Sequence, residues 1–435
     1  MSGRTLAARA SHFDFNKPVM PERQSPLFSD VGILAVVPDR WGSRWQSRHH
    51  ILTRLASYFE VVWVNDPPGW RDLSTDWRSQ SLAVWGEPIA TPSGFQVYDA
   101  PLWLPKIGRP RWLADVTFRN QLQQASQLLF RRGVKEIVLY LWRPDFAPAL
   151  QLVPHQLSCY HVDDEYSFSP VEHETDGVEA ALLRAAGQVF IHSSAMMEKK
   201  GALNPHTEFA PNGVDYASFA VETPVPADLA QIPQPRIGYT GVLKDQLDWA
   251  LLDQMSSLHP EWSFVFAGKA SPHLKTAEAI QNLSRRPNVY FLGAKSTEEL
   301  ARYPQHFQVC IMPYAIDGYT KYIYPLKLHE YLATGRPVVG SAIRSLLQYS
   351  DLVLIARTAE EWSASLNQAL SSAEDTPSKR FERQRTAQSH DWEILVRRIA
   401  EVIMTRLGPQ HQQQWTTSPS SFSPGRKLQN QLLIR

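Results

Sequence analysis

This chain has few cysteines, almost no net charge and no long hydrophobic run. Its 435 residues include two cysteines, and each stands inside an apolar segment. Such cysteines are usually small buried hydrophobic residues, so we expect neither a disulfide framework nor a cysteine metal site, which fits a reducing compartment. The formal net charge is +1. It argues against nucleic acid as a partner, because nucleic-acid-binding proteins usually carry a strong basic excess.

The chain also lacks the apolar segments that membrane insertion or secretion requires. No apolar run reaches the roughly 18 residues of a membrane-spanning helix, and residues 1–18 lack the continuous apolar core of a secretion signal. Hydrophobic residues make up 43% and charged residues 20% of the chain, as in globular proteins. We therefore expect a cytoplasmic protein that could lie peripherally on the inner face of the plasma membrane.

Short apolar segments alternate with helical patterns in both halves of the chain. The expected strands are 31–37, 61–65, 136–142, 157–162 and 188–193 in the first half, and 236–240, 263–267, 289–293, 309–313, 337–340 and 352–356 in the second. The alternation predicts an α/β protein with two Rossmann-like, doubly wound domains. Ligands in such sheets bind beyond the carboxyl ends of the strands, so a cleft between the two domains is the expected site.

Composition sets the expected domain boundaries. The segment 222–236 is rich in proline and is expected to link the domains. An apolar stripe along 391–407 must be buried against one of the two domains. The resulting division is 1–28 disordered, 29–221 first domain, 222–236 linker, 236–390 second domain, 391–407 C-terminal helix, and 408–435 a polar, disordered tail.

The segment YPLKLHEYLATGRPVVG (324–340) predicts a short helix that runs into a buried strand. Pro325 suits the first turn of a helix, and Gly335 can end it in a left-handed conformation. Lys327 and Glu330 share one face near the helix start. A lysine beside exposed backbone N–H groups suits a diphosphate, and a glutamate one turn later can accept hydrogen bonds from hydroxyl groups. The alternative is an ordinary amphipathic helix with a solvated Lys–Glu pair.

Six segments in a fixed order resemble the nucleotide-sugar-binding half of group 1 (family 4-like) glycosyltransferases of the GT-B fold. These segments are 209–219, 236–252, 262–270, 288–303, 309–314 and 324–339. The first half is similar more loosely, through 39–56 and 158–167, to the subgroup that makes bacterial polysaccharides. The resemblance implies a GT-B architecture in which the second domain binds the sugar donor. It also implies that the helix 391–407 returns to pack on the first domain, with packing on its own domain as the alternative.

The resemblance also implies roles for particular residues of the second domain. The expected donor-binding residues are Gly241, Lys244, Met312, Lys327 and Glu330. Lys327 would neutralise the leaving diphosphate, and Gly241 would let the backbone approach it. Core packing is an equally good account of Met312. A tight turn also accounts for Gly241, and there both accounts can be true.

Two positions depart from the family pattern. Many members carry two glutamates eight residues apart, and the position of the first is Tyr322 here. Many also carry a basic residue directly after the loop glycine, where this chain has Val242. Lys244 could substitute for it. These departures leave the donor contacts and the choice between retaining and inverting chemistry open.

The first half offers candidates for the acceptor side. Asp163 and Asp164 directly follow an expected strand, and either could act as the general base of an inverting enzyme. A loop-bracing or helix-capping role is the alternative. Trp45 and His49 are expected on the acceptor side, with core packing as the alternative. No metal site is expected, because no histidine or cysteine spacing supports one.

The resulting hypothesis is a hexosyltransferase-type glycosyltransferase that needs no metal or cofactor. It would move a sugar from a nucleotide-sugar donor to a polysaccharide or lipid-linked glycan acceptor. Segment 101–113 mixes tryptophan with basic residues, a combination that suits membrane headgroups. A packed irregular loop is the alternative there. A nucleotide-sugar epimerase of the same fold and a catalytically silent scaffold or binding subunit are the alternative functions.

Overall fold

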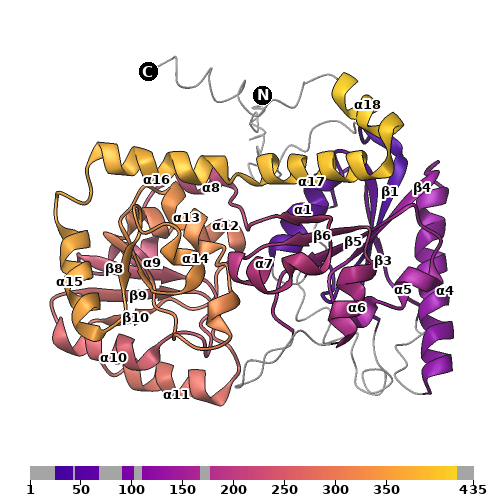
Figure 1. Ribbon diagram of the computed structural model, residues 1–435. Coiled ribbons are helices and arrows are strands. Elements are labelled where there is room, and N and C mark those ends of the chain that lie inside the picture. The colour runs from indigo at the N-terminus through magenta and orange to yellow at the C-terminus, as the bar shows by residue number, and fades with distance from the viewer. Residues whose placement is uncertain (1–24, 43–44, 68–90, 102–109, 167–176, 419–435) are drawn as a thin grey trace, which may run out of the picture.

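The computed structural model of the protein describes residues 25–42, 45–67, 91–101, 110–166 and 177–418. These residues form two α/β domains, each built on a parallel sheet (Figure 1). The first sheet has the order β3-β2-β1-β4-β5-β6-β7 and the second the order β10-β9-β8-β11-β12-β13. In each sheet the chain starts near the middle and proceeds in both directions, which is the doubly wound arrangement expected from the sequence.

The first sheet consists of β1 (Phe28–Val36), β2 (Phe59–Val64), β3 (Phe95–Tyr98), β4 (Glu136–Leu141), β5 (Leu157–Val162), β6 (Gln188–Ile191) and β7 (Thr207–Phe209). Its helices are α1 (Ser47–Leu55), α4 (Arg111–Phe130), α5 (Ala149–Leu152), α6 (Gly177–Ala185) and α7 (Ser194–Lys200), with 3₁₀ turns η1 (Pro144–Phe146) and η2 (Gly201–Leu203). β2, β5 and β6 are buried along their whole length, as parallel strands covered on both faces must be.

The second sheet consists of β8 (Arg236–Thr240), β9 (Ser263–Ala267), β10 (Val289–Phe291), β11 (Val309–Met312), β12 (Val338–Ser341) and β13 (Leu354–Ala356). Around it lie α8 (Tyr216–Ala220), α9 (Ala227–Ala230), α10 (Trp249–Leu258), α11 (Leu274–Leu283), α12 (Thr297–Leu300), η3 (Pro304–His306), η4 (Thr320–Tyr322), α13 (Lys327–Ala333), α14 (Arg344–Leu347), α15 (Ala359–Leu370) and α16 (Pro377–Ser389). The predicted helix in 324–340 is α13, and Gly335 follows it at φ +74°.

The chain crosses between the domains at a short paired segment. Val214 forms a parallel bridge with Asp391, and the backbone N–H of Trp392 donates to the Val214 carbonyl at 3.0 Å. The expected linker 222–236 is not a free connection, because Leu229 and Ile232 are buried in the core of the second domain. These apolar side chains fix the proline-rich segment to that domain, so the crossing lies before it.

The long C-terminal helix α17 (Trp392–Leu407) packs on the first domain, in contact with α1 (Figure 1). Val396, Ile399 and Ile403 join its core, and the His50 ring stacks on Trp392 at 5.1 Å. Of the expected apolar stripe, Ile394 instead lies on the exposed side. The helix therefore ties the end of the chain to the first domain.

The expected disordered tail is wrong over its first part. Residues of α18 (Pro409–Thr417) form a helix, and its Trp415 ring lies 5.9 Å from Phe28 and 5.6 Å from Tyr58. His411 of the same helix also lies 3.3 Å from Glu136, between Nε2 and Oε2. Composition alone did not indicate this docked helix. Residues 1–24 and 419–435, which include most of the expected disordered N-terminus and the end of the tail, lie outside the described residues.

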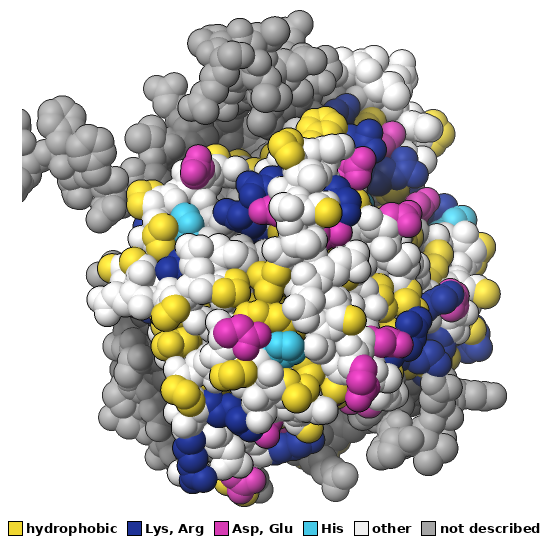
Figure 2. All heavy atoms as spheres, turned by 90° about the vertical axis from the view of Figure 1, so that its left-hand side faces the viewer, with side chains coloured by type: hydrophobic (Ala, Val, Ile, Leu, Met, Phe, Trp, Pro, Cys, Tyr) yellow, Lys and Arg dark blue, Asp and Glu magenta, His cyan; other side chains and the backbone are white. Residues whose placement is uncertain are grey.

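The charges on the surface are mixed in sign. On the outer face of the second domain, basic and acidic side chains are interspersed with hydrophobic ones (Figure 2), in keeping with a net charge of +1. Among the described residues, no helix is both long enough and apolar enough to span a membrane.

Candidate active site between the two domains

A cavity of about 210 Å³ lies between the carboxyl edges of the two sheets. Its walls come from both domains and hold several polar groups. The first domain contributes Gln46, Ser47, Asp163, Asp164, His192 and Asn212, and the second contributes Tyr239, Lys244, Gln246, Tyr314, Tyr319, Tyr322 and Lys327, among others. The tertiary structure therefore brings together the candidate acids of one domain and the candidate cations of the other.

Lys327 enters the cavity from the start of α13. The helix is held in place by Tyr331, which is fully buried and whose hydroxyl accepts the Thr240 N–H at 2.8 Å at the end of β8. The Lys327 Nζ lies 5.0 Å from the centre of the Tyr239 ring. The ammonium group is thus placed at the carboxyl end of β8, beside the loop that begins with Gly241.

The backbone conformation of Gly241 favours glycine, and the absent side chain leaves room for Lys327. Its φ of +112° is one that side chains rarely adopt, and a Cβ there would lie 2.7 Å from both Cε and Nζ of Lys327. Gly241 therefore permits the close approach of the Lys327 ammonium to the loop backbone.

Lys244 and Gln246 lie between two cavities. Both residues line the interdomain cavity and also a neighbouring cavity of about 410 Å³ on the second domain, which Lys269 lines as well. Lysine side chains thus line both of these neighbouring cavities at the carboxyl ends of β8 and β9. Such a surface can compensate the charge of a phosphorylated ligand.

Two of the expected donor residues are placed differently. Met312 is completely buried in the core of the second domain, so its side chain does not reach the cavity, and Tyr314, two residues later, lines it instead. β11 ends at Met312, so Tyr314 lies in the loop beyond the sheet edge, after Pro313, and is not held to the face on which Met312 packs. Glu330 is half-buried on α13 and is not among the described residues that line the cavity. Its contact with sugar or ribose hydroxyls stays a prediction.

Asp163 is braced within its own domain. One carboxylate oxygen accepts from Nη1 of Arg48 at 2.6 Å, and the other accepts from the Tyr166 hydroxyl at 3.1 Å. Arg48 also pairs with Asp39. Burial raises the pKa of Asp163, and the Arg48 guanidinium opposes that rise. With both oxygens engaged, Asp163 fits the loop-bracing alternative better than a general base.

Asp164 faces the second domain. Its Oδ1 accepts the backbone N–H of Glu165 at 2.8 Å, and the carboxylate also forms a hydrogen bond with Tyr319. Burial, followed by the charge of Asp164, raises the pKa of Tyr319. Since a tyrosine donor can be exchanged for a ligand hydroxyl, Asp164 is the better placed of the two candidate bases.

His192 is a site residue that the sequence analysis missed. Its Nδ1 must donate to the Val162 carbonyl at 3.0 Å, because a carbonyl can only accept. Burial lowers the pKa of His192, so the ring is neutral and Nε2 is an acceptor. Within the described part of the chain Nε2 has no hydrogen-bond partner, and the residue lines the cavity. Its position directly after β6, at the carboxyl edge of the sheet, was the available signal.

Trp45 and His49 do not line the interdomain cavity. His49 is fully buried, with its ring 4.7 Å from that of Trp63 and 5.6 Å from that of Trp45. Burial lowers the pKa of His49 to about 3. The packing alternative therefore accounts for His49. Gln46 and Ser47, at the start of α1, face the cavity instead.

Direct contacts hold the two domains together around the cavity. Nδ2 of Asn212 donates to the Tyr324 carbonyl at 2.6 Å, and Arg344 pairs with Glu198. The Lys199 ammonium lies 5.0 Å from the ring of Tyr322, the residue at the position of the first family glutamate. Among the described residues, no three His, Cys, Asp or Glu side chains are grouped so that they could hold a metal ion.

The second domain matches a known family. Residues 234–372 match the family model described as "Glycosyl transferases group 1". A protein of Bacillus subtilis (strain 168), named as the teichuronic acid biosynthesis glycosyltransferase TuaH, is 33% identical over 138 residues, which are 31% of this chain and 34% of that protein. The chain thus matches about a third of the length of this curated relative. These matches confirm the resemblance predicted for the donor half.

Solved structures are similar in fold to most of the chain, including both domains. The sucrose-phosphate synthase of Thermosynechococcus elongatus has a TM-score of 0.65 at 16% identity, covering 86% of this chain and 98% of that one. A trehalose-6-phosphate structure from E. coli with UDP-2-fluoro glucose scores 0.62 at 13% identity over 86% and 98%. A glycosyltransferase from Rickettsia africae scores 0.62 at 11% identity over 87% and 99%. The predicted GT-B fold is confirmed.

Proposed function

We propose that this chain, whose second domain is a group 1 glycosyltransferase domain within a GT-B fold, transfers a sugar from a nucleotide diphosphate sugar to a glycan acceptor. One observation carries the proposal. The interdomain cavity places the Lys244 and Lys327 side of the second domain against Asp164 and His192 of the first. Cations on one wall and hydrogen-bond acceptors on the other are what sugar transfer between a diphosphate and a hydroxyl group requires.

The second domain would stabilise the leaving group. As the bond between the sugar C1 and the diphosphate oxygen breaks, negative charge develops on that oxygen. Lys327, held beside the Gly241 backbone, is placed to compensate this charge, and Lys244 could add to it. Fixed positive groups in a site shielded from water stabilise developing charge more strongly than water does. No metal ion is required for this role.

The first domain would activate the acceptor. A hydroxyl oxygen of the acceptor forms the new bond to C1, and its proton passes to the Asp164 carboxylate after the hydroxyl displaces Tyr319 from it. His192 would accept a hydrogen bond at Nε2 from a sugar hydroxyl and thereby orient the ring. This division gives each domain one substrate, as the two-domain architecture suggests.

The named role of the Bacillus subtilis relative favours a polysaccharide or lipid-linked glycan as the acceptor. Part of segment 101–113, namely 102–109, lies outside the described residues. Trp112, at the start of α4, has 67% of its surface exposed, which supports a peripheral contact with the inner face of the plasma membrane. We infer a cytoplasmic location from the cytoplasmic supply of nucleotide sugars.

A catalytically silent binding subunit is the alternative, and Tyr322 at the position of the first family glutamate is the observation behind it. Both functions require the chain to bind a nucleotide, and a thermal-shift screen with UDP, GDP, dTDP and their sugars tests this requirement. A bound nucleotide at 100 times its Kd stabilises the folded state by about 2.7 kcal/mol. Inorganic phosphate is the control, and a chain that no nucleotide stabilises would contradict the proposal.

Turnover separates the enzyme from the silent subunit. Release of the nucleotide diphosphate from the stabilising donor should be measurable, with or without acceptor, and it should persist in EDTA. Binding without any release would favour the silent subunit, and a strict need for Mg²⁺ or Mn²⁺ would contradict the lysine-based mechanism. An epimerase would convert the sugar without an acceptor.

A further inference from the structure

Tyr324 contacts the first domain at the interdomain cavity, which it lines directly before α13. Its carbonyl accepts from Nδ2 of Asn212 of the first domain at 2.6 Å. Its ring meets the ring of His192 nearly edge-on, with centroids 6.4 Å apart and planes at 71°, a favourable arrangement of two rings. Lys327 follows only three positions later in the chain. Tyr324 therefore lies between the residues that we place on the acceptor side and on the donor side.

A chain of hydrogen bonds holds the Tyr324 hydroxyl in place. This hydroxyl lies 2.8 Å from Nε2 of His329 and 2.7 Å from the Tyr349 hydroxyl. The Tyr349 hydroxyl in turn lies 3.2 Å from Nε2 of His390. Tyr324 and His329 are buried, and Tyr349 and His390 are half-buried. We call these four residues the Tyr324 network.

The direction of donation in the Tyr324 network follows from one end of it. Burial lowers the pKa of His329 and of His390, so both rings are neutral at neutral pH. Nδ1 of His390 must donate to the Thr386 carbonyl at 3.0 Å, because a carbonyl only accepts, and Nε2 of His390 therefore accepts from Tyr349. Tyr349 then accepts from Tyr324, and Tyr324 accepts from Nε2 of His329. Each hydroxyl in the network both donates and accepts.

The second nitrogen of His329 shows what this histidine contributes. With Nε2 as the donor, Nδ1 is an acceptor, and it is buried without a hydrogen-bond partner in the described part of the chain. The His390 ring stacks on His329 at 3.9 Å. A buried acceptor without a partner lowers stability, so packing alone would favour an apolar side chain here. The hydrogen bond to Tyr324 is what distinguishes the histidine from such a side chain.

The far end of the Tyr324 network lies at the crossing between the domains. The backbone carbonyl of His390 accepts the Val214 N–H at 3.0 Å, beside the bridge that pairs Val214 with Asp391. The network thus connects the Tyr324 hydroxyl at the cavity to the segment through which the chain passes from one domain to the other.

We propose that Tyr324 is a positioning residue for the transfer, which aligns His192 of the first domain with Lys327 of the second. The rest of the Tyr324 network fixes Tyr324 relative to the crossing. Tyr331 already holds α13 within its own domain through the Thr240 N–H, so losing the network should leave donor binding intact and change how the two walls face each other. This inference rests on the proposed function, whose two walls it aligns.

NMR of the full chain with ¹⁵N-labelled histidine tests the alignment without any ligand. Ring signals are assigned with single histidine-to-glutamine variants, and the protonated nitrogens should be Nε2 of His329 and Nδ1 of His390. Tyr349→Phe removes the central hydroxyl and should shift the ring signals of His192, a residue that lies in the other domain. Tyr324→Phe, which keeps the ring but loses the hydroxyl, should shift them as well.

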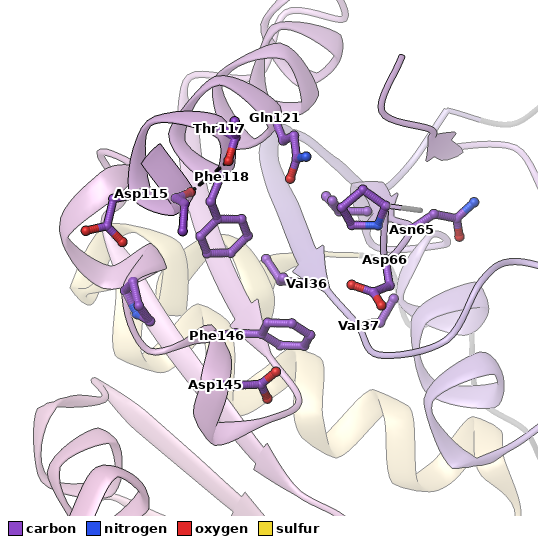
Figure 3. Close-up of a pocket in the computed structure, with 14 residues that line it drawn as sticks. Val36, Val37, Asn65, Asp66, Asp115, Thr117, Phe118, Gln121, Asp145 and Phe146 are labelled. Atoms are coloured by element: carbon purple, nitrogen blue, oxygen red, sulfur yellow. Dashed lines mark hydrogen bonds between the residues drawn. The ribbon is translucent and has the colours of Figure 1, made fainter. Parts of the chain in front are cut away.

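Two control variants separate alignment from a general loss of stability. Tyr303→Phe also removes a buried tyrosine hydroxyl of the second domain, one that donates to Asp228 at 2.9 Å, but Tyr303 does not line the interdomain cavity. Phe118→Leu alters the first domain at a separate cavity of about 170 Å³, where Figure 3 shows the Phe118 ring. Both controls should leave the His192 signals in place.

Turnover and nucleotide binding are measured in the same variants. Release of nucleotide from UDP-glucose, GDP-mannose and dTDP-glucose should fall about fivefold in Tyr349→Phe, the change that one net hydrogen bond corresponds to. The thermal shifts with UDP, GDP and dTDP should match those of wild type.

Unmoved His192 signals in Tyr349→Phe and Tyr324→Phe, or an equal shift in Tyr303→Phe, would overturn the proposal. Weaker nucleotide binding in Tyr349→Phe would overturn it too, because the network would then act on the donor site alone. A wild-type chain that no nucleotide stabilises would instead contradict the proposed function, even with the His192 signals shifted as expected.

Discussion

Gly241 and Lys327 are in direct contact across 86 positions of the sequence, at the carboxyl edge of the second sheet. A Cβ at Gly241 would lie 2.7 Å from the Lys327 Nζ. The loop after β8 and the start of α13 therefore form one surface, with a backbone and an ammonium group side by side. If the donor diphosphate binds here, the two residues act together, and each can be tested against a matched control.

We expect Gly241→Ala to reduce nucleotide release far more than it reduces stability. The new methyl group displaces the Lys327 side chain and is strained at φ +112°. Gly293→Ala is the control, because Gly293 also has a positive φ, +72°, but nothing lies within 4 Å of its Cβ position. Both variants should lose about 1–2 kcal/mol of unfolding free energy to backbone strain. Equal activities in the two variants would contradict the role of the contact.

We expect Lys327→Ala to lower turnover at least about tenfold, a loss of about 1.4 kcal/mol in transition-state stabilisation. The fold should persist, because removing a lysine that lines a cavity leaves the core intact. Lys275→Ala, in an exposed part of α11, is the control and should behave like wild type. Steady-state nucleotide release and the melting temperature are measured together. Wild-type turnover in Lys327→Ala would remove Lys327 from the mechanism.

The two neighbouring aspartates should respond differently to substitution by asparagine. Asp163→Asn removes the charge paired with Arg48 at 2.6 Å and should cost about 2 kcal/mol of stability. That is less than for a buried charge left alone, because Asp39 still pairs with Arg48.

Asp164→Asn should instead leave the melting temperature within about 1 °C of wild type and lower kcat, with donor binding unchanged. Calorimetry, kcat and the nucleotide thermal shift are compared for both variants. A loss of donor affinity in Asp164→Asn would point to a structural cluster. Unaltered kcat in that variant would rule out Asp164 as the base.

Acid should destabilise the first domain through His49. Burial lowers the pKa of His49 from 6.5 to about 3, so the unfolded chain takes up the proton first. The contribution of His49 to the free energy of unfolding is fully present above about pH 6.5 and is lost as the pH decreases from there towards 3. By pH 5 the loss from this residue is about 2 kcal/mol.

Denaturant unfolding of wild type and His49→Phe checks this expectation between pH 5 and 8. The variant should show a shallower decline in unfolding free energy below pH 6.5. The curves of unfolding free energy against pH should be nearly parallel for the two proteins between pH 7 and 8, where the histidine is almost entirely neutral in both the folded and the unfolded state. Parallel curves over the whole range would show that His49 is not responsible.

Local patterns gave the strands and the fold class, because a buried parallel strand is an uninterrupted apolar run that any arrangement of neighbours must cover. β5 and β8 have the predicted bounds for this reason. The short edge strands β3 and β7 were missed, since edge strands need fewer apolar residues. The helix α18 was missed because its docking depends on contacts with distant parts of the chain, Trp415 with Phe28 and His411 with Glu136.

For the site, the sequence by itself determined which residue types stand at strand ends and helix starts, and so it identified Lys327, Gly241 and the Asp163–Asp164 pair. The tertiary structure alone decided which of these meet. Whether a side chain beside a strand end faces the cavity or the core depends on register and on partners far away in the chain. Arg48 engages Asp163, Met312 turns inward, and His192 reaches the cavity because β6 ends there. The contact between Arg48 and Asp163 joins segments 115 residues apart, and such packing of distant segments is beyond the reach of any local pattern.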